Sequence, residues 1–138
     1  MTTWLMDTPL MKMLASPKAV ALHHWCEANS ASLFLSAASL TEITAAICKI
    51  QASQPQRAAA LRDWLDVIVT RFTDRIHPVD SNISLRAGAV LPNLAHDIPR
   101  HRLHDAILVA TARNHGHGLL TRRDAIFGSW TQTPIATI

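Results

Sequence analysis

The sequence of 138 residues contains no tyrosine, only two cysteines and no long apolar run. The cysteines, Cys26 and Cys48, are far from a CxxC spacing, so neither a disulfide framework nor a thiolate zinc site is supported. No apolar stretch approaches the roughly 20 residues that cross a bilayer, and Asp7 interrupts the one stretch that could mimic a signal peptide. We therefore expect a soluble protein of the reducing cytoplasm, with no membrane segment.

The composition excludes a disordered chain and favours one compact domain. Hydrophobic residues make up 49% of the chain and charged residues 17%, and a chain of this length holds a single core, which we assign to residues 1–138. The net charge is +3, and every arginine lies after residue 56. An arginine-borne positive charge is compatible with a polyanionic partner. Without tyrosine, the chain lacks the aromatic platform on which many single-strand binders stack bases.

Short apolar runs alternate with helical patterns along the chain. Strands are predicted at 4–6, 33–36, 76–79, 118–121 and 134–138, and helices at 9–14, 17–29, 39–50, 53–72, after a cap at 80–81, and at 104–115. This alternation predicts an α/β fold, a three-layer α/β/α sandwich with a mostly parallel sheet of about five strands. In such sheets, functional sites form at the carboxyl ends of the strands.

Three carboxylates occupy positions at that edge of the predicted sheet. Asp7 ends the first strand, Glu42 lies near the start of the helix after the second strand, and Asp105 begins the apolar helix before the fourth strand. Each has a structural explanation: a helix cap for Asp7, a capping box with Ser39 for Glu42, and a favourable interaction with the helix dipole for Asp105. Glutamate is rare in this chain, and all three positions lie at the same predicted edge of the sheet. One shared functional site therefore explains the three acids better than three separate structural roles do.

Several segments carry a family resemblance in order and spacing. They are WLMDT at 4–8, LFLS at 33–36 with LTEI at 40–43, HDAILVATA at 104–112 and LLTR at 119–122. This pattern resembles the PIN-domain ribonucleases, and among them the toxins of VapC type, over nearly the whole chain. The resemblance implies a single PIN-like domain that cleaves RNA as the toxin of a type II toxin–antitoxin module. It also implies a small cognate antitoxin as partner, and a homodimer.

The resemblance implies that Asp7, Glu42 and Asp105 bind a metal ion. Hydrolysis of a phosphodiester needs a hard cation that acidifies the attacking water, and hard cations take oxygen ligands. Mg²⁺ is the expected cofactor, and Mn²⁺ should substitute for it. Thr121, at the end of the fourth strand, could orient a water or a phosphate, and Asp124 could supply a further acid. Candidate RNA contacts are Arg100, Arg102, Arg122 and Arg123.

Two positions depart from the family pattern and leave an alternative open. Pro9 stands where the family has a small polar residue, and Arg123 stands where it often has a fourth acid or an asparagine, with Asp124 one residue later. The alternative is a catalytically degenerate PIN-like domain that binds RNA or a partner protein without cleavage. A phospho-acceptor domain is disfavoured because no lysine follows Lys49. Asp80 is predicted to be only a helix cap.

Overall fold

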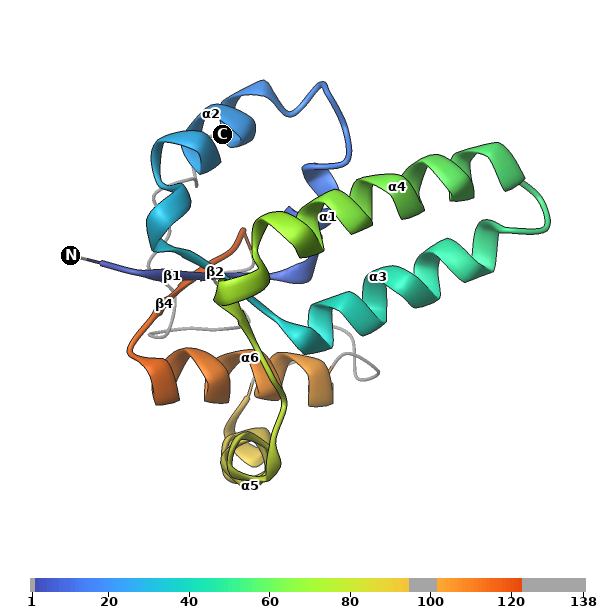
Figure 1. Ribbon diagram of the computed structural model, residues 1–138. Coiled ribbons are helices and arrows are strands. Elements are labelled where there is room, and N and C mark those ends of the chain that lie inside the picture. The colour runs from blue at the N-terminus through green and yellow to red at the C-terminus, as the bar shows by residue number, and fades with distance from the viewer. Residues whose placement is uncertain (1, 95–101, 123–138) are drawn as a thin grey trace.

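The computed structural model describes residues 2–94 and 102–122. Its strands form one sheet in the order β3-β2-β1-β4, and every pair is parallel (Figure 1). The strands are β1 (Trp4–Met6), β2 (Leu33–Ser36), β3 (Ile76–His77) and β4 (Gly118–Leu120). The predicted α/β fold with a parallel sheet is confirmed. The strand predicted at 134–138 lies outside the described residues.

Helices cover both faces of this sheet, which gives the predicted three layers. The α-helices are α1 (Thr8–Met13), α2 (Val20–Ala28), α3 (Ala37–Ile50), α4 (Pro55–Arg71), α5 (Ser81–Val90) and α6 (Arg102–His115). Figure 1 shows α5 and α6 on one side of the sheet and α1 to α4 on the other, with α3 and α4 forming a projecting hairpin. Short 3-10 turns occur at Ser30–Ser32, Thr73–Arg75 and Leu91–Asn93.

The hydrophobic core consists of two clusters, one on each face of the sheet, because side chains along each strand point alternately to the two faces. Leu5 of β1 packs in a cluster with residues of α5 and α6, whereas its neighbour Met6 packs in the cluster formed with α1 to α4. Leu119 and Leu120 of β4 divide in the same way. Successive side chains of a strand point to opposite faces, so a strand with helices on both sides is apolar throughout. This burial fixes the register of β1, and therefore the place where Asp7 leaves the sheet.

The buried helix α6 agrees with its sequence pattern. All but one of the residues from Ala106 to Ala112 are buried, and Gly116 ends the helix with φ of +71°, a conformation that glycine adopts readily. The helix starts at Arg102, two residues earlier than predicted, which leaves Asp105 in its first turn as expected. The Thr111 hydroxyl donates a hydrogen bond of 2.7 Å to the carbonyl oxygen of Ile107.

The predicted helix starts are partly wrong. α3 begins at Ala37, because Ser36 rather than Ser39 is its cap: the Ser36 hydroxyl accepts a bond of 3.1 Å from the amide of Ala38. Ser39 lies in the first turn and is buried, so the capping box with Glu42 does not form. α2 begins at Val20 instead of residue 17.

Two predictions around β3 are confirmed. β3 is an edge strand of the described sheet, as predicted, but it ends at His77 rather than at residue 79, since the next residue, Pro78, has no N–H to continue the ladder. Asp80 caps α5, with its Oδ1 accepting a bond of 2.9 Å from the amide of Ile83. Across residues 2–94 and 102–122, no helix combines the length and the apolar character needed to span a membrane.

Candidate functional site

Asp7 is held rigidly where β1, β4 and α1 meet. Its amide donates to the carbonyl oxygen of Leu120 at 3.1 Å, which continues the pairing of β1 with β4. Its Oδ1 accepts a bond of 3.0 Å from the amide of Leu10, and its Oδ2 accepts a bond of 2.5 Å from the Thr121 hydroxyl. The carboxylate is fully buried. Pro9, which departs from the family pattern, lies in the first turn of α1. Backbone N–H groups of a first helical turn have no partner within the helix, so proline there removes no helical hydrogen bond.

Thr8 connects this strand end to two helices. Its hydroxyl donates to Ser39 Oγ of α3 at 2.8 Å, and the same oxygen lies 2.8 Å from His104 Nε2 of α6. The Thr8 hydroxyl therefore links α3 to α6. Thr8 and Ser39 are buried, so this small polar junction is a fixed part of the structure.

His104 extends the same junction to Glu42. Its Nδ1 lies 3.3 Å from Glu42 Oε1. The imidazole of His104 therefore lies between the Thr8 hydroxyl and the Glu42 carboxylate. Its side chain is 12% exposed and that of Glu42 is 26% exposed, so this part of the junction reaches the surface.

These contacts link the three segments of the chain that carry the predicted acids. Asp7 precedes Thr8, Glu42 contacts His104, and Asp105 follows His104 in the first turn of α6. Asp105 is 1% exposed, and its helix packs against β1 and α3. One edge of the sheet thus presents acids from three separate segments, as the sequence predicted.

The acids supply the right kind of donor for a hard cation, since carboxylate oxygens are the ligands that Mg²⁺ prefers. Within residues 2–94 and 102–122, however, no group of three or more His, Cys, Asp or Glu side chains is arranged to hold a metal ion. Asp124, the further predicted acid, lies outside the described residues, as do Arg100 and Arg123. Metal binding by Asp7, Glu42 and Asp105 stays a prediction.

The other predicted site residues lie around the same edge. Thr121 is buried and uses its hydroxyl hydrogen for Asp7, so it positions that carboxylate. Arg102 and Arg122 are exposed. The Arg102 guanidinium donates to the carbonyl oxygen of Leu91 at 3.1 Å, and the Arg122 guanidinium lies 3.9 Å from Met13 Sδ. Both arginines stand within three residues of a site residue in sequence, where they can meet a polyanion.

The sequence analysis missed the joining roles of Thr8, Ser39 and His104. One usable signal was spacing, because Ser39 and Glu42 are three residues apart and therefore share a face of α3. The other was the position of His104, directly before Asp105 at a helix start. Because Ser39 was interpreted as a helix cap, its position on the same face of α3 as Glu42 was not recognised.

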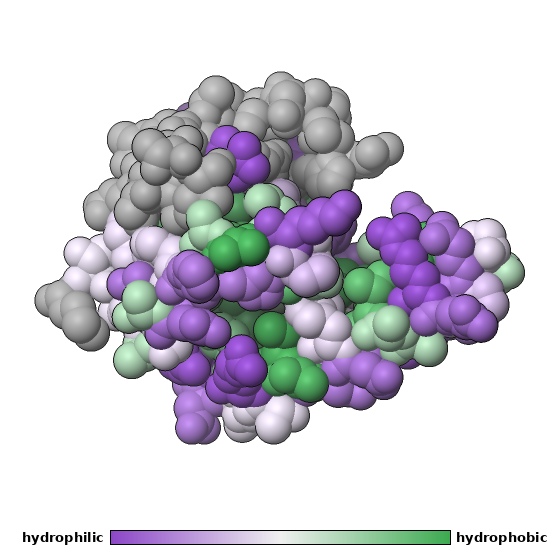
Figure 2. Space-filling view, turned by 90° about the horizontal axis from the view of Figure 1, so that it is seen from above, coloured by the Kyte–Doolittle hydropathy of each residue, from purple (hydrophilic) through white to green (hydrophobic). Residues whose placement is uncertain are grey.

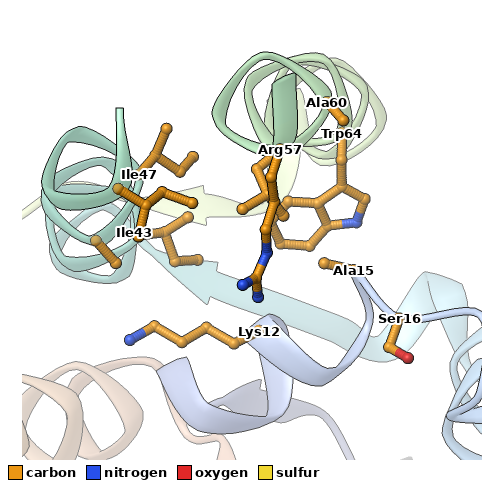
Figure 3. A pocket seen from close by; sticks show the side chains of 11 residues that line it. Lys12, Ala15, Ser16, Ile43, Ile47, Arg57, Ala60 and Trp64 are labelled. Atoms are coloured by element: carbon orange, nitrogen blue, oxygen red, sulfur yellow. The ribbon is translucent and has the colours of Figure 1, made fainter. Parts of the chain in front are cut away.

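A groove separate from the acids lies between α1, α3 and α4. Its volume is about 480 Å³, and none of the candidate catalytic residues lines it. Figure 3 shows the Arg57 guanidinium of α4 reaching toward Lys12 of α1, with Ile43 and Ile47 of α3 on one side and Trp64 on the other. In the view from above, the surface is hollowed beside the projecting end of the α3–α4 hairpin (Figure 2).

Comparisons with known proteins identify the fold. No family model matches the chain, and no curated protein matches it in sequence. The structure is similar to the crystal structure of FitAcB from Neisseria gonorrhoeae, with a TM-score of 0.80 and 17% identity over 99% of this chain and 100% of that one. It is also similar to DNA-bound VapBC from Salmonella typhimurium, with a TM-score of 0.70 and 15% identity over 97% and 94%.

A third similar structure is a toxin–antitoxin complex from Klebsiella pneumoniae, with a TM-score of 0.64 and 22% identity over 96% and 98% of the two chains. The fold is consistent with a PIN-like three-layer sandwich. At identities this low, the likeness shows the fold alone. The Klebsiella pneumoniae structure is described as a toxin–antitoxin complex.

Proposed function

We propose that this protein is the toxin of a type II toxin–antitoxin module and that it hydrolyses RNA with Mg²⁺ or Mn²⁺ as cofactor. The observation that carries the proposal is the junction of Thr8 with His104 and of His104 with Glu42, which brings Asp7, Glu42 and Asp105 to one edge of the sheet. The fold shared with toxin–antitoxin complexes supports the biological context.

In this proposal the acids hold the metal ion from different elements of the fold. When bound, the divalent ion acidifies the attacking water and neutralises charge on the phosphate. Asp7 and Asp105, both buried, would hold the ion from β1 and α6, and Glu42 would do so from α3. Asp124 would add a further oxygen ligand. None of these acids would act as a covalent nucleophile.

The surrounding residues would orient the acids and the substrate. Thr121 and His104 are positioning residues, since they bond to Asp7 and Glu42. Arg102 and Arg122 would contact phosphates of the RNA, and so would Arg100 and Arg123, because guanidinium groups match phosphate geometry.

The proposed antitoxin would occupy a surface other than the acidic site. The groove between α1, α3 and α4 has apolar walls from Ile43, Ile47 and Trp64, and Lys12 and Arg57 give it positive charge. Such a groove suits an apolar segment that also carries acidic side chains. The proposed active form of the toxin, free of antitoxin, is a homodimer.

Removal of metal tests the proposal directly. We expect the purified protein to cut structured RNA in the presence of Mg²⁺ or Mn²⁺. We expect EDTA to stop cleavage completely, because carboxylates without a metal ion cannot acidify the attacking water or neutralise charge on the phosphate. Gel analysis of labelled RNA measures the products, and excess Mg²⁺ added after EDTA should restore them. Cleavage that persists in EDTA contradicts the metal-dependent mechanism, and binding without cleavage supports the degenerate alternative.

Replacement of His104 by glutamine tests its positioning role. The variant loses the charged contact with Glu42, and residues that orient metal ligands typically contribute about 10- to 100-fold to metal affinity or activity. We expect the Mg²⁺ concentration for half-maximal cleavage to rise by roughly that factor, with a smaller change in rate at saturating metal. His24→Gln, an exposed position on α2, is the matched control. An equal loss at every metal concentration would mean that His104 does not act through the metal site.

A further inference from the structure

Three histidines cluster at the end of α6 opposite to Asp105. His77 Nε2 and His117 Nε2 lie 2.9 Å apart. The ring of His115 stacks on that of His77, with centroids 3.7 Å apart. Phe34 stacks on His77 at 5.2 Å and on His117 at 4.3 Å. The cluster is about 15 Å along α6 from Asp105, at 1.5 Å per residue, so it is separate from the candidate site.

The cluster joins segments that are far apart in the sheet. His77 ends β3, and His117 directly precedes β4, and these are the two outer strands among those that the structure describes. Two strands, β2 and β1, lie between β3 and β4, and the ring of Phe34 on β2 stacks on both histidines. Thr3, just before β1, lies 2.6 Å from His117 Nδ1 through its hydroxyl. His115 is the last residue of α6, so its contact with His77 connects the end of that helix to the cluster.

This arrangement requires that at least one of the two imidazoles is neutral. A hydrogen bond between two Nε2 atoms needs one nitrogen with a hydrogen and one without. The ring centroids of His77 and His117 are 5.1 Å apart, close to the longest separation that a 2.9 Å N–N contact allows. The two nitrogens therefore face each other in hydrogen-bond geometry. Full protonation would place two N–H groups and two positive charges head to head.

Among the described residues, the groups around the pair are mostly neutral or basic. Thr3 and Phe34, which face the pair from β1 and β2, are neutral. The last turn of α6 carries Arg113 and His115, which are basic groups. From α5, Asn82 bonds to Asn114 beside the cluster, and Asp80 uses its Oδ1 to cap the helix.

We propose that His77, His115 and His117 form an acid-labile clamp, which joins β3 and β4 to the end of α6 and opens when both His77 and His117 are protonated. Opening would loosen α6, the helix that carries His104 and Asp105, from the sheet. The clamp depends only on these contacts, and it holds whether or not the protein cleaves RNA.

The direction of the pH effect follows from the shifted groups. Burial, and then the nearby His115, lower the pKa of His77. Burial, and then His77 and His115, lower the pKa of His117 to about 4 from 6.5. The unfolded chain therefore binds protons at higher pH than the folded one. The stability that the clamp contributes is fully present above pH 6.5 and is lost as the pH falls toward 4.

Urea unfolding at pH 7.5 and at pH 5.0 tests the clamp. Between these values we expect the unfolding equilibrium constant of the wild type to rise roughly tenfold more than that of His117→Gln, which cannot take up the proton. His24→Gln, exposed on α2, should behave like the wild type. An identical pH response in all three proteins would overturn the proposal.

NMR titration of the imidazoles in the wild-type protein tests the clamp independently, even if the variant His117→Gln fails to fold. The ring signals of His77 and His117 should shift only at a pH well below the range of free histidine. Titration of both rings in the ordinary range would overturn the clamp.

Discussion

The variant Asp7→Asn should lose RNA cleavage by at least about 100-fold and keep its fold. Residues that merely orient metal ligands contribute about 10- to 100-fold, and loss of a ligand's charge should exceed that. The measurement is the initial rate of cleavage at saturating Mg²⁺, with thermal unfolding recorded for the same sample. Cleavage at the wild-type rate would remove Asp7 from the mechanism.

The fold should survive this change because asparagine can replace both structural bonds of Asp7. Asparagine caps helices as well as aspartate does, so its oxygen can accept from the amide of Leu10. Its amide can donate to the hydroxyl oxygen of Thr121. Asp80→Asn is the matched control, since Asp80 caps α5 through the same kind of bond to Ile83 and lies outside the proposed site. Loss of cleavage in Asp80→Asn as well would point to a general effect on folding.

The variant Leu5→Ala should lower the free energy of unfolding by about 3 to 4 kcal/mol, within the usual cost of a buried leucine truncation. Leu5 is completely buried in the central strand β1, against α5 and α6. The cavity left behind has rigid walls, because the neighbouring strands are packed on both sides. Urea unfolding at pH 7.5 measures the change.

Leu85→Ala is the matched control for that experiment. Leu85 lies on α5 and is 78% exposed, so the same truncation should change the free energy of unfolding by less than about 0.5 kcal/mol. Equal losses in the two variants would contradict the assignment of β1 to the centre of the core.

The sequence predicted those elements whose signals are local. The apolar body of α6 and Gly116 define a buried helix with its end, and Asp80 followed by Ser81 defines the start of α5. The period of the apolar runs predicted parallel strands, because only strands buried on both faces are apolar throughout. The same topology is the basis for the prediction that Asp7, Glu42 and Asp105 share a site.

The remaining features depend on contacts between distant residues. Ser36 and Ser39 both satisfy the preferences of a helix cap, and only the packing of Thr8 against Ser39 decides between them. Thr8 and His104 are 96 positions apart, so no local pattern predicts their hydrogen bond. The same is true of His77 and His117, whose proximity comes from the order of strands in the sheet.

The position of Asp7 beside the last described strand has a consequence during synthesis of the chain on the ribosome. Asp7 is made among the first residues, whereas Thr121, which bonds to its carboxylate, follows 114 positions later. β1 can pair with β4 only after nearly the whole chain has been translated. The contact between Asp7 and Thr121 at this edge of the sheet therefore forms only after β4 has been translated.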